Sequence, residues 1–104
     1  MDEPDRRQKH AAERKAALEE RDRNDLKTLM ATPQGRRFFW GFLNAAGLFQ
    51  TSFTGDAATS FFNEGRRNLG LTIQARLLDA DEANYFLMMQ EAAQEEKQDE
   101  VYRF

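Results

Sequence analysis

Hydrophobic residues recur three and four places apart through the middle and last parts of the chain, which is the period of an amphipathic α-helix. The pattern predicts three helices, over 33–46, 57–78 and 80–97. Their apolar faces hold Phe38, Phe39, Phe42, Leu43 and Ala46, then Ala58, Phe61, Phe62, Leu69 and Ile73, then Tyr85, Phe86, Met88, Met89, Ala92 and Ala93. Stripes of aromatic and methionine residues usually fill a core, so we expect 32–94 to form a compact three-helix unit. No stretch alternates long enough to predict a strand, and the predicted fold class is all-α.

Residues typical of helix ends stand at the expected boundaries. Thr32 is a suitable N-cap before Pro33, and Gly47 suits the position that follows a C-cap. Asp56 is expected to cap the second of these helices. Asp79 has an acidic residue three places further on, as in a capping box, and is expected to start the last helix.

Residues 5–31 are predicted to form a helix of a different kind. They are rich in strong helix formers but carry no broad apolar stripe. Opposite charges stand four residues apart at Asp5/Lys9, Lys9/Glu13, Lys15/Glu19, Glu19/Arg23 and Arg21/Asp25. Such a helix would span about 40 Å at roughly 1.5 Å per residue. We therefore expect 1–31 to be a charged helical arm, either solvated or lying along a partner protein.

Charge is distributed unevenly along the chain. Residues 2–27 hold eight acidic and eight basic side chains, and residues 28–78 hold five arginines, no lysine and only two acids. Residues 79–104 hold eight acids against two bases, which gives the formal net charge of −3 for the whole chain. The middle segment is therefore basic although the protein is acidic.

Composition removes several classes of function. The chain has no cysteine, which excludes disulfides, thiolate catalysis and zinc–thiolate sites. His10 is the only histidine and stands in the charged arm, so a Ser-His-Asp arrangement lacks its parts. No phosphate-binding or dinucleotide-binding glycine motif is present. We expect no enzyme activity, no cofactor and no metal. The apolar stretches are far shorter than the roughly 20 residues that cross a bilayer, and we expect an unexported protein without a membrane span.

The tripeptide Gly-Arg-Arg occurs twice, at 35–37 and 65–67. On a helical wheel Gly35 and Gly65 fall within the apolar faces of their helices. Glycine costs about 1 kcal/mol relative to alanine in a helix, but it lets a neighbouring helix approach closely. We therefore predict that these two helices cross near the two glycines.

The arginines of both copies are candidate partner-binding residues. Arg36 and Arg66 lie at the flanks of the apolar faces, and Arg37 and Arg67 point outward. Arginine contacts carboxylates and phosphates through two N–H groups at once, and Trp40 lies one turn from Arg36, within cation–π reach. Arginine and tryptophan are frequent in the energetic centres of protein interfaces. Two alternatives remain, that the arginines neutralise the acidic last helix of the same chain or that they bind nucleic acid.

The chain ends in Val-Tyr-Arg-Phe behind an acidic run. We expect an acidic end with a short aromatic tail over 95–104, after the arm at 1–31 and the three-helix unit at 32–94. The tail either folds back on the core or plugs a pocket on another subunit, and we favour the second. Its candidate partner-binding residues are Val101, Tyr102 and Phe104.

The segments TPQGRRFFWGFLNAAGLF, FFNEGRRNLGL and ANYFLMMQEA follow one another in an order that resembles a family of small tailed-bacteriophage proteins, typified by one from a Bordetella phage. In that family a first helix with Gly-Arg precedes an aromatic loop, a helix with Gly-Arg-Arg, and a last helix with Tyr that ends in Glu. The matching residues here are Gly35, Arg36, Phe49, Phe53, Gly65, Arg66, Arg67, Leu71, Tyr85 and Glu91. The resemblance spans residues 28–92 and leaves out the arm and the tail.

The resemblance implies a structural protein of the phage particle and not a reaction. We expect a non-enzymatic component at the head-to-tail region around the portal, or an internal ejected protein, which docks on the portal, on other virion proteins or on copies of itself. Its expected location is the virion, after synthesis in the bacterial cytoplasm. The alternatives are a nucleic-acid-binding DNA-packaging protein and a scaffold-type assembly protein. Nucleic acid is the secondary partner, because binding it requires a coherent cationic surface.

Overall fold

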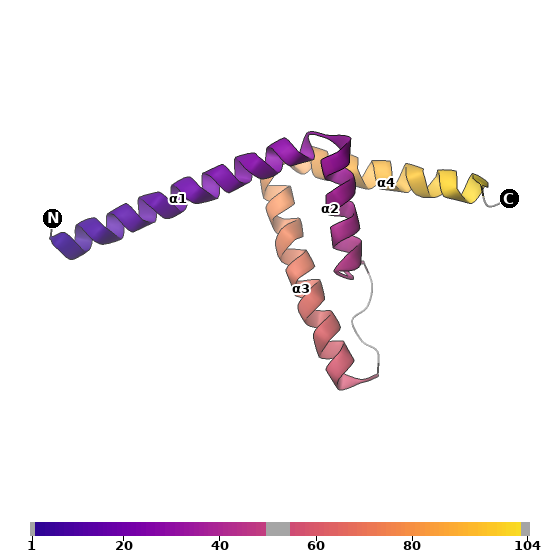
Figure 1. The fold of residues 1–104 in the computed structure, drawn as a ribbon, viewed down its shortest axis with the longest axis horizontal. Helices are drawn as coiled ribbons and strands as arrows, with labels where there is room; N and C mark the ends of the chain where they lie inside the picture. The colour runs from indigo at the N-terminus through magenta and orange to yellow at the C-terminus, as the bar shows by residue number, and fades with distance from the viewer. Residues whose placement is uncertain (1, 50–54, 103–104) are drawn as a thin grey trace.

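The computed structural model describes residues 2–49 and 55–102, and this part of the chain contains four α-helices and no strand (Figure 1). Helix α1 covers Glu3–Met30, α2 covers Pro33–Ala45, α3 covers Ala57–Ala80 and α4 covers Glu82–Tyr102. The predicted all-α fold class is confirmed. None of the helices in the described ranges is both long and apolar enough to cross a bilayer.

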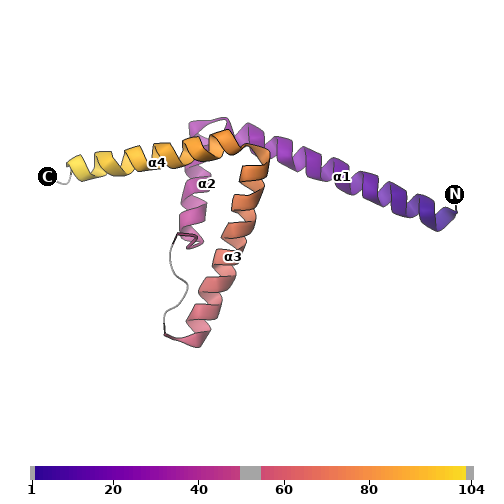
Figure 2. The same ribbon diagram turned by 180° about the vertical axis from the view of Figure 1, so that it is seen from behind.

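The helices form a flat, extended molecule in the shape of a T. α1 and α4 run out to opposite sides, and α2 and α3 lie side by side as the stem (Figure 1 and Figure 2). The molecule measures 72 × 39 × 15 Å, and its radius of gyration is 18.9 Å. A compact chain of this length would have a radius of gyration of about 13 Å. The three-helix unit predicted over 32–94 is somewhat extended and not clearly compact, because α4 projects from the junction instead of folding back along the stem (Figure 1).

The core lies where the four helices meet and continues along the stem between α2 and α3. Its buried hydrophobic residues are Met30, Leu43, Ala46, Leu48, Leu77, Tyr85 and Met88. The side-chain amide of Gln74 donates to the hydroxyl oxygen of Tyr85 at 2.7 Å, so the polar atom of this buried phenol has a partner. Core packing of Leu43, Tyr85 and Met88 agrees with the faces predicted for α2 and α4.

The apolar face predicted for α3 is mostly exposed. Phe61, Phe62 and Leu69 are 73%, 68% and 55% exposed. The helix buries Gly70 and Leu77 instead. At 100° per residue, Gly70 lies opposite Phe61 on the helix. Helical spacing identifies residues that share a face, but it does not say which face the rest of the chain covers.

Three of the four predicted helix ends are observed. The Thr32 hydroxyl accepts from the backbone N–H of Gly35 at 3.1 Å, and Gly47 has a φ of 73° just after the C-cap of α2. Asp56 accepts from the backbone N–H of Thr59 at 3.1 Å and from its hydroxyl. The hydrogen bonds from Thr59, first from its hydroxyl, hold the pKa of Asp56 below its ordinary value. This cap therefore stabilises α3 fully above the ordinary pKa of an aspartate and is lost as the pH falls through the lowered pKa.

The predicted start of the last helix at Asp79 is wrong. Asp79 lies inside α3, and the backbone N–H of Asn84 donates to Asp81 at 3.1 Å. Asp81 has extended backbone angles between the two helices and accepts the main-chain bond from Tyr85. α3 thus runs on by two residues beyond 78. Asp79, inside this extension, forms an exposed ion pair with Arg23 of α1 at 2.9 Å.

The predicted helix crossing at Gly35 and Gly65 is also wrong. A Cβ added at Gly65 would have no described atom within 4 Å. A Cβ at Gly35 would overlap the backbone carbonyl of Leu29, which belongs to α1. The close approach of α2 and α3 occurs at Gly70, where a Cβ would lie 2.8 Å from the Cβ of Ala46. Glycine therefore does allow two helices to approach, but at a position outside the Gly-Arg-Arg repeats.

We expect Gly70→Ala to lower the free energy of unfolding by about 1–2 kcal/mol, because overpacking against Ala46 outweighs the better helix propensity of alanine. Gly65→Ala is the matched control in the same helix, and it should raise stability by up to about 1 kcal/mol because its methyl group meets open space. Thermal unfolding at low protein concentration measures both. Equal effects of the two substitutions would contradict the crossing at Gly70.

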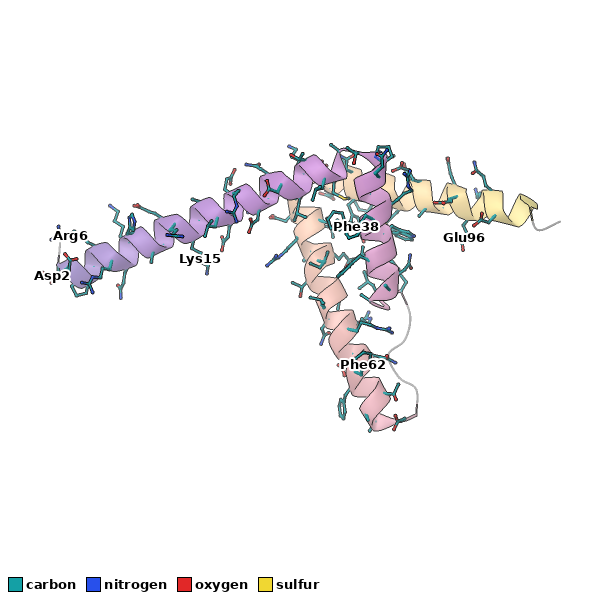
Figure 3. All side chains as sticks on the ribbon, viewed as in Figure 1. Asp2, Arg6, Lys15, Phe38, Phe62 and Glu96 are labelled. Atoms are coloured by element: carbon teal, nitrogen blue, oxygen red, sulfur yellow. The ribbon has the colours of Figure 1, made fainter. Side chains whose placement is uncertain are left out.

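The long N-terminal helix is confirmed. Side chains stand out all round it, as at Arg6 and Lys15 (Figure 3), and residues 3–22 are exposed. Of the five ion pairs predicted from spacing, only Lys15–Glu19 is present in the described structure, at 4.0 Å. Surface pairs of this kind contribute little, since solvent screens them and long side chains lose entropy in forming them.

The C-terminal tail differs from its prediction. α4 continues through the acidic run to Tyr102, so the helix that was predicted to end at 97 also includes Val101 and Tyr102. Phe104 lies outside the described residues. Binding of a partner by these three residues stays a prediction.

Candidate functional site: the groove between α2 and α4

A groove of about 580 Å³ runs between α2 and α4. From α2 it is lined by Arg36, Arg37, Trp40 and Gly41, and from α4 by Met88, Glu91, Ala92, Gln94, Glu95 and Gln98. The groove lies where α4 leaves the core. Its α2 wall belongs to the packed stem, and its other wall is α4 alone. This groove gathers three of the predicted site residues, all from the first Gly-Arg-Arg segment and the turn after it.

Arg36 forms the base of the groove and is only 7% exposed. Its Nε donates to Glu91 of α4, and one Nη donates to the second carboxylate oxygen at 3.4 Å. The other Nη donates to the backbone carbonyl of Met30 at 2.9 Å. Through its planar guanidinium group, Arg36 of α2 thus connects the C-terminal end of α1 to α4. Arg36 was predicted to lie at the rim, but it is buried and its donors are used inside the fold. Partner binding by Arg36 stays a prediction.

Arg37 and Trp40 do lie at the rim. Arg37 is exposed and has no ion pair among the described residues. Trp40 is half-buried, and its ring stacks on Phe49 with 5.0 Å between the ring centroids. The cation–π contact predicted between Arg36 and Trp40 is not among the ring contacts of the described structure, because Arg36 is turned to Glu91. Arg37, one position further on, is the arginine that remains available to a partner.

The second Gly-Arg-Arg copy lies away from this groove. Arg66 is exposed, and its guanidinium carbon stands 6.0 Å from the centre of the Phe62 ring. It also lies beside Gly47, at the end of α2, where the helix dipole favours a positive charge. Arg67 is half-buried. The two copies therefore belong to different surfaces of the molecule.

A second groove, of about 470 Å³, lies between α1, α2 and α3. Leu26, Leu29, Phe39 and Ile73 supply its apolar lining, and Arg23 and Asp79 are at its edge. The hydrogen bond and charge of Asp79 raise the pKa of Arg23. No local pattern in the sequence predicts this groove, because its walls come from residues about fifty positions apart.

No group of three or more histidine, cysteine or carboxylate side chains among the described residues could hold a metal ion. The two grooves present apolar and aromatic surface beside guanidinium and carboxylate groups. Surfaces of this composition suit protein partners.

The family model described as Bbp19-like phage protein matches residues 26–90. The match begins in the last turns of α1 and ends in the first half of α4, so it covers the junction of the T and the whole stem. Most of the arm and the outer half of α4 lie outside it. No curated protein and no solved structure matches the chain.

Proposed function

We propose that this chain, which belongs to the Bbp19-like phage protein family, is a non-enzymatic structural component of a tailed-phage particle. It acts by docking on neighbouring proteins, at the head-to-tail region around the portal or as an internal protein that is ejected with the genome. Its expected partners are portal or other virion proteins and further copies of the chain. The family membership and the open shape of the fold support this role.

The open shape is the observation that carries the proposal. The accessible surface of 8125 Å² exceeds by about 2,000 Å² that of a compact protein of this mass. Eleven large hydrophobic side chains of the described structure remain exposed, among them Phe38 of α2. A flat layer of helices with this much uncovered apolar surface fits a protein that becomes compact only within an assembly.

The groove between α2 and α4 is the proposed docking site for a virion protein. Arg37 supplies a free guanidinium, Trp40 supplies an aromatic wall, and Glu95 supplies a negative charge on the facing helix. A partner segment with an acidic and an apolar side chain fits this surface.

Charge reversal at Arg37 is expected to reduce the amount of the protein in particles at least about fivefold, which corresponds to roughly 1 kcal/mol of lost binding. Arg37→Glu should leave the melting temperature unchanged, since the side chain has no partner inside the described structure. Quantitative mass spectrometry of purified particles, with the variant supplied in the host, measures incorporation. Arg14→Glu in the exposed arm is the matched control, and equal incorporation of both variants would remove Arg37 from the site.

Mass spectrometry of purified virions also tests the function itself. We expect the chain in finished particles at a fixed ratio to the portal protein. Its presence in immature heads and absence from finished particles would overturn the proposal in favour of a scaffold-type assembly protein.

A DNA-packaging role is the rival, and a salt titration separates it from docking on proteins. DNA binding through several arginines would weaken steeply between about 50 and 200 mM salt. The burial of Arg36 against Glu91 removes one cation from any such surface. We therefore expect no tight DNA binding, and a steep salt dependence of tight binding would support the rival.

A further inference from the structure

α3 carries a second apolar face that the described residues leave uncovered. Phe61, Gly65 and Leu69 follow one another at intervals of four along this face, with Ala58 and Phe62 beside them. Phe61 and Phe62 are 73% and 68% exposed, and Leu69 is 55% exposed. Phe62 lies on the part of α3 that extends beyond the end of α2 (Figure 3). The face is thus free of the stem's own packing and open to another molecule.

Gly65 lies at the centre of this face, and neither its backbone conformation nor a contact within the described structure requires glycine at this position. Its φ is not positive, and a Cβ would meet no described atom within 4 Å. Glycine is a poor helix former, and nothing within the described structure compensates for this cost at Gly65. Between large apolar side chains it allows the backbone of a second helix to come close. Within the described structure no helix of this chain takes that place.

We propose that this face binds the same face of a second copy, with the two α3 helices antiparallel and crossing at Gly65. A two-fold axis through Gly65 brings Phe61, four residues before it, level with Leu69 of the partner subunit, four residues after it. Gly65 of each subunit then lies against Gly65 of the other at the centre of the contact, and the bulky side chains of Phe61 and Leu69 pack on both sides. A face that is symmetric in this way about one residue fits an isologous contact, in which the same patch serves both subunits.

The area and the charge of the face agree with a second copy as the occupant. The three large side chains expose on the order of 400 Å² per copy, taking roughly 200 Å² for an aromatic residue. Two such faces together bury about 800 Å², which is below the 1,200–2,000 Å² of stable interfaces and fits a weak, reversible dimer. Arg66 lies at the edge over the Phe62 ring, so no charge has to be buried at the crossing. The proposal goes beyond the docking function and does not depend on it.

A single cysteine tests the crossing directly, because the chain has none of its own. Two thiols at the two-fold axis come within the Cα separation of roughly 4.4–6.8 Å that a disulfide needs. Gly65→Cys should therefore form a covalent dimer under mild oxidation at least about tenfold faster than Gly41→Cys, since association raises the effective thiol concentration. Gly41 is the matched control, a mid-helix glycine that also faces open space. Equal rates for the two variants would overturn the proposal.

Sedimentation of the full chain gives an independent measurement. We expect a reversible dimer over concentrations of about 1 to 100 µM, and Gly65→Leu should raise its dissociation constant at least about tenfold. The melting temperature of a dilute sample should not fall, since the new side chain meets open space within the chain. A wild-type chain that stays monomeric throughout this range would overturn the proposal, whatever the result for incorporation into particles.

Discussion

Gly35→Ala is expected to lower the free energy of unfolding by about 3 kcal/mol or more, at the upper end of the cost of overpacking. The Cβ would overlap the carbonyl oxygen of Leu29 and come within 2.8 Å of its carbonyl carbon. These are backbone atoms of the last turn of α1, and they cannot move aside as a flexible side chain would. The same carbonyl accepts from the hydroxyl of Thr32, so the whole corner between α1 and α2 would have to shift. Thermal unfolding should show a melting temperature lower by about 10 °C or more.

Gly41→Ala is the control for Gly35. Both glycines lie in α2, but a Cβ at Gly41 meets nothing within 4 Å in the described structure. Alanine there should stabilise the protein by up to about 1 kcal/mol through its better helix propensity. If Gly35→Ala proves as harmless as Gly41→Ala, the tight corner between α1 and α2 described above does not exist.

Arg36→Ala is expected to destabilise the protein by about 3 kcal/mol, the lower end of the range for breaking a buried ion pair. The substitution leaves the Glu91 carboxylate and the Met30 carbonyl without their donor. We place the cost at the lower end because the Glu91 side chain is 37% exposed and recovers part of its hydration. Since Arg36 joins three helices, α4 should lose helical structure. The far-ultraviolet circular dichroism of the chain and the cooperativity of its unfolding should both decrease.

The adjacent arginine controls for loss of positive charge. Arg37→Ala should change the free energy of unfolding by less than about 0.5 kcal/mol, because Arg37 is exposed and unpaired in the described structure. The double variant Arg36→Met with Glu91→Leu should recover much of the loss, since an apolar pair removes the unpaired charge. Similar melting temperatures for Arg36→Ala and Arg37→Ala would show that the ion pair does not hold α4 to the core.

The candidate site could be predicted only in part. Arg37 and Trp40 are at the rim of a groove, as their place on the helix indicated. Arg36 lies one position earlier and is buried, because its acceptor Glu91 is 55 residues away in the sequence. The family resemblance had already set Arg36 and Glu91 among its matching residues, and the structure shows that they form one ion pair.

The sequence by itself determined the local structure: the all-α class, the helix starts at Thr32 and Asp56 and the end at Gly47. These depend on side-chain and backbone contacts within four residues, which spacing and residue type reveal. Only the tertiary structure decided which face of α3 is buried, that Gly70 and not Gly65 meets α2, and that α4 leaves the core. The spacing of apolar residues shows which faces of a helix can be buried. Which of two apolar faces is buried depends on long-range contacts, which no local pattern indicates.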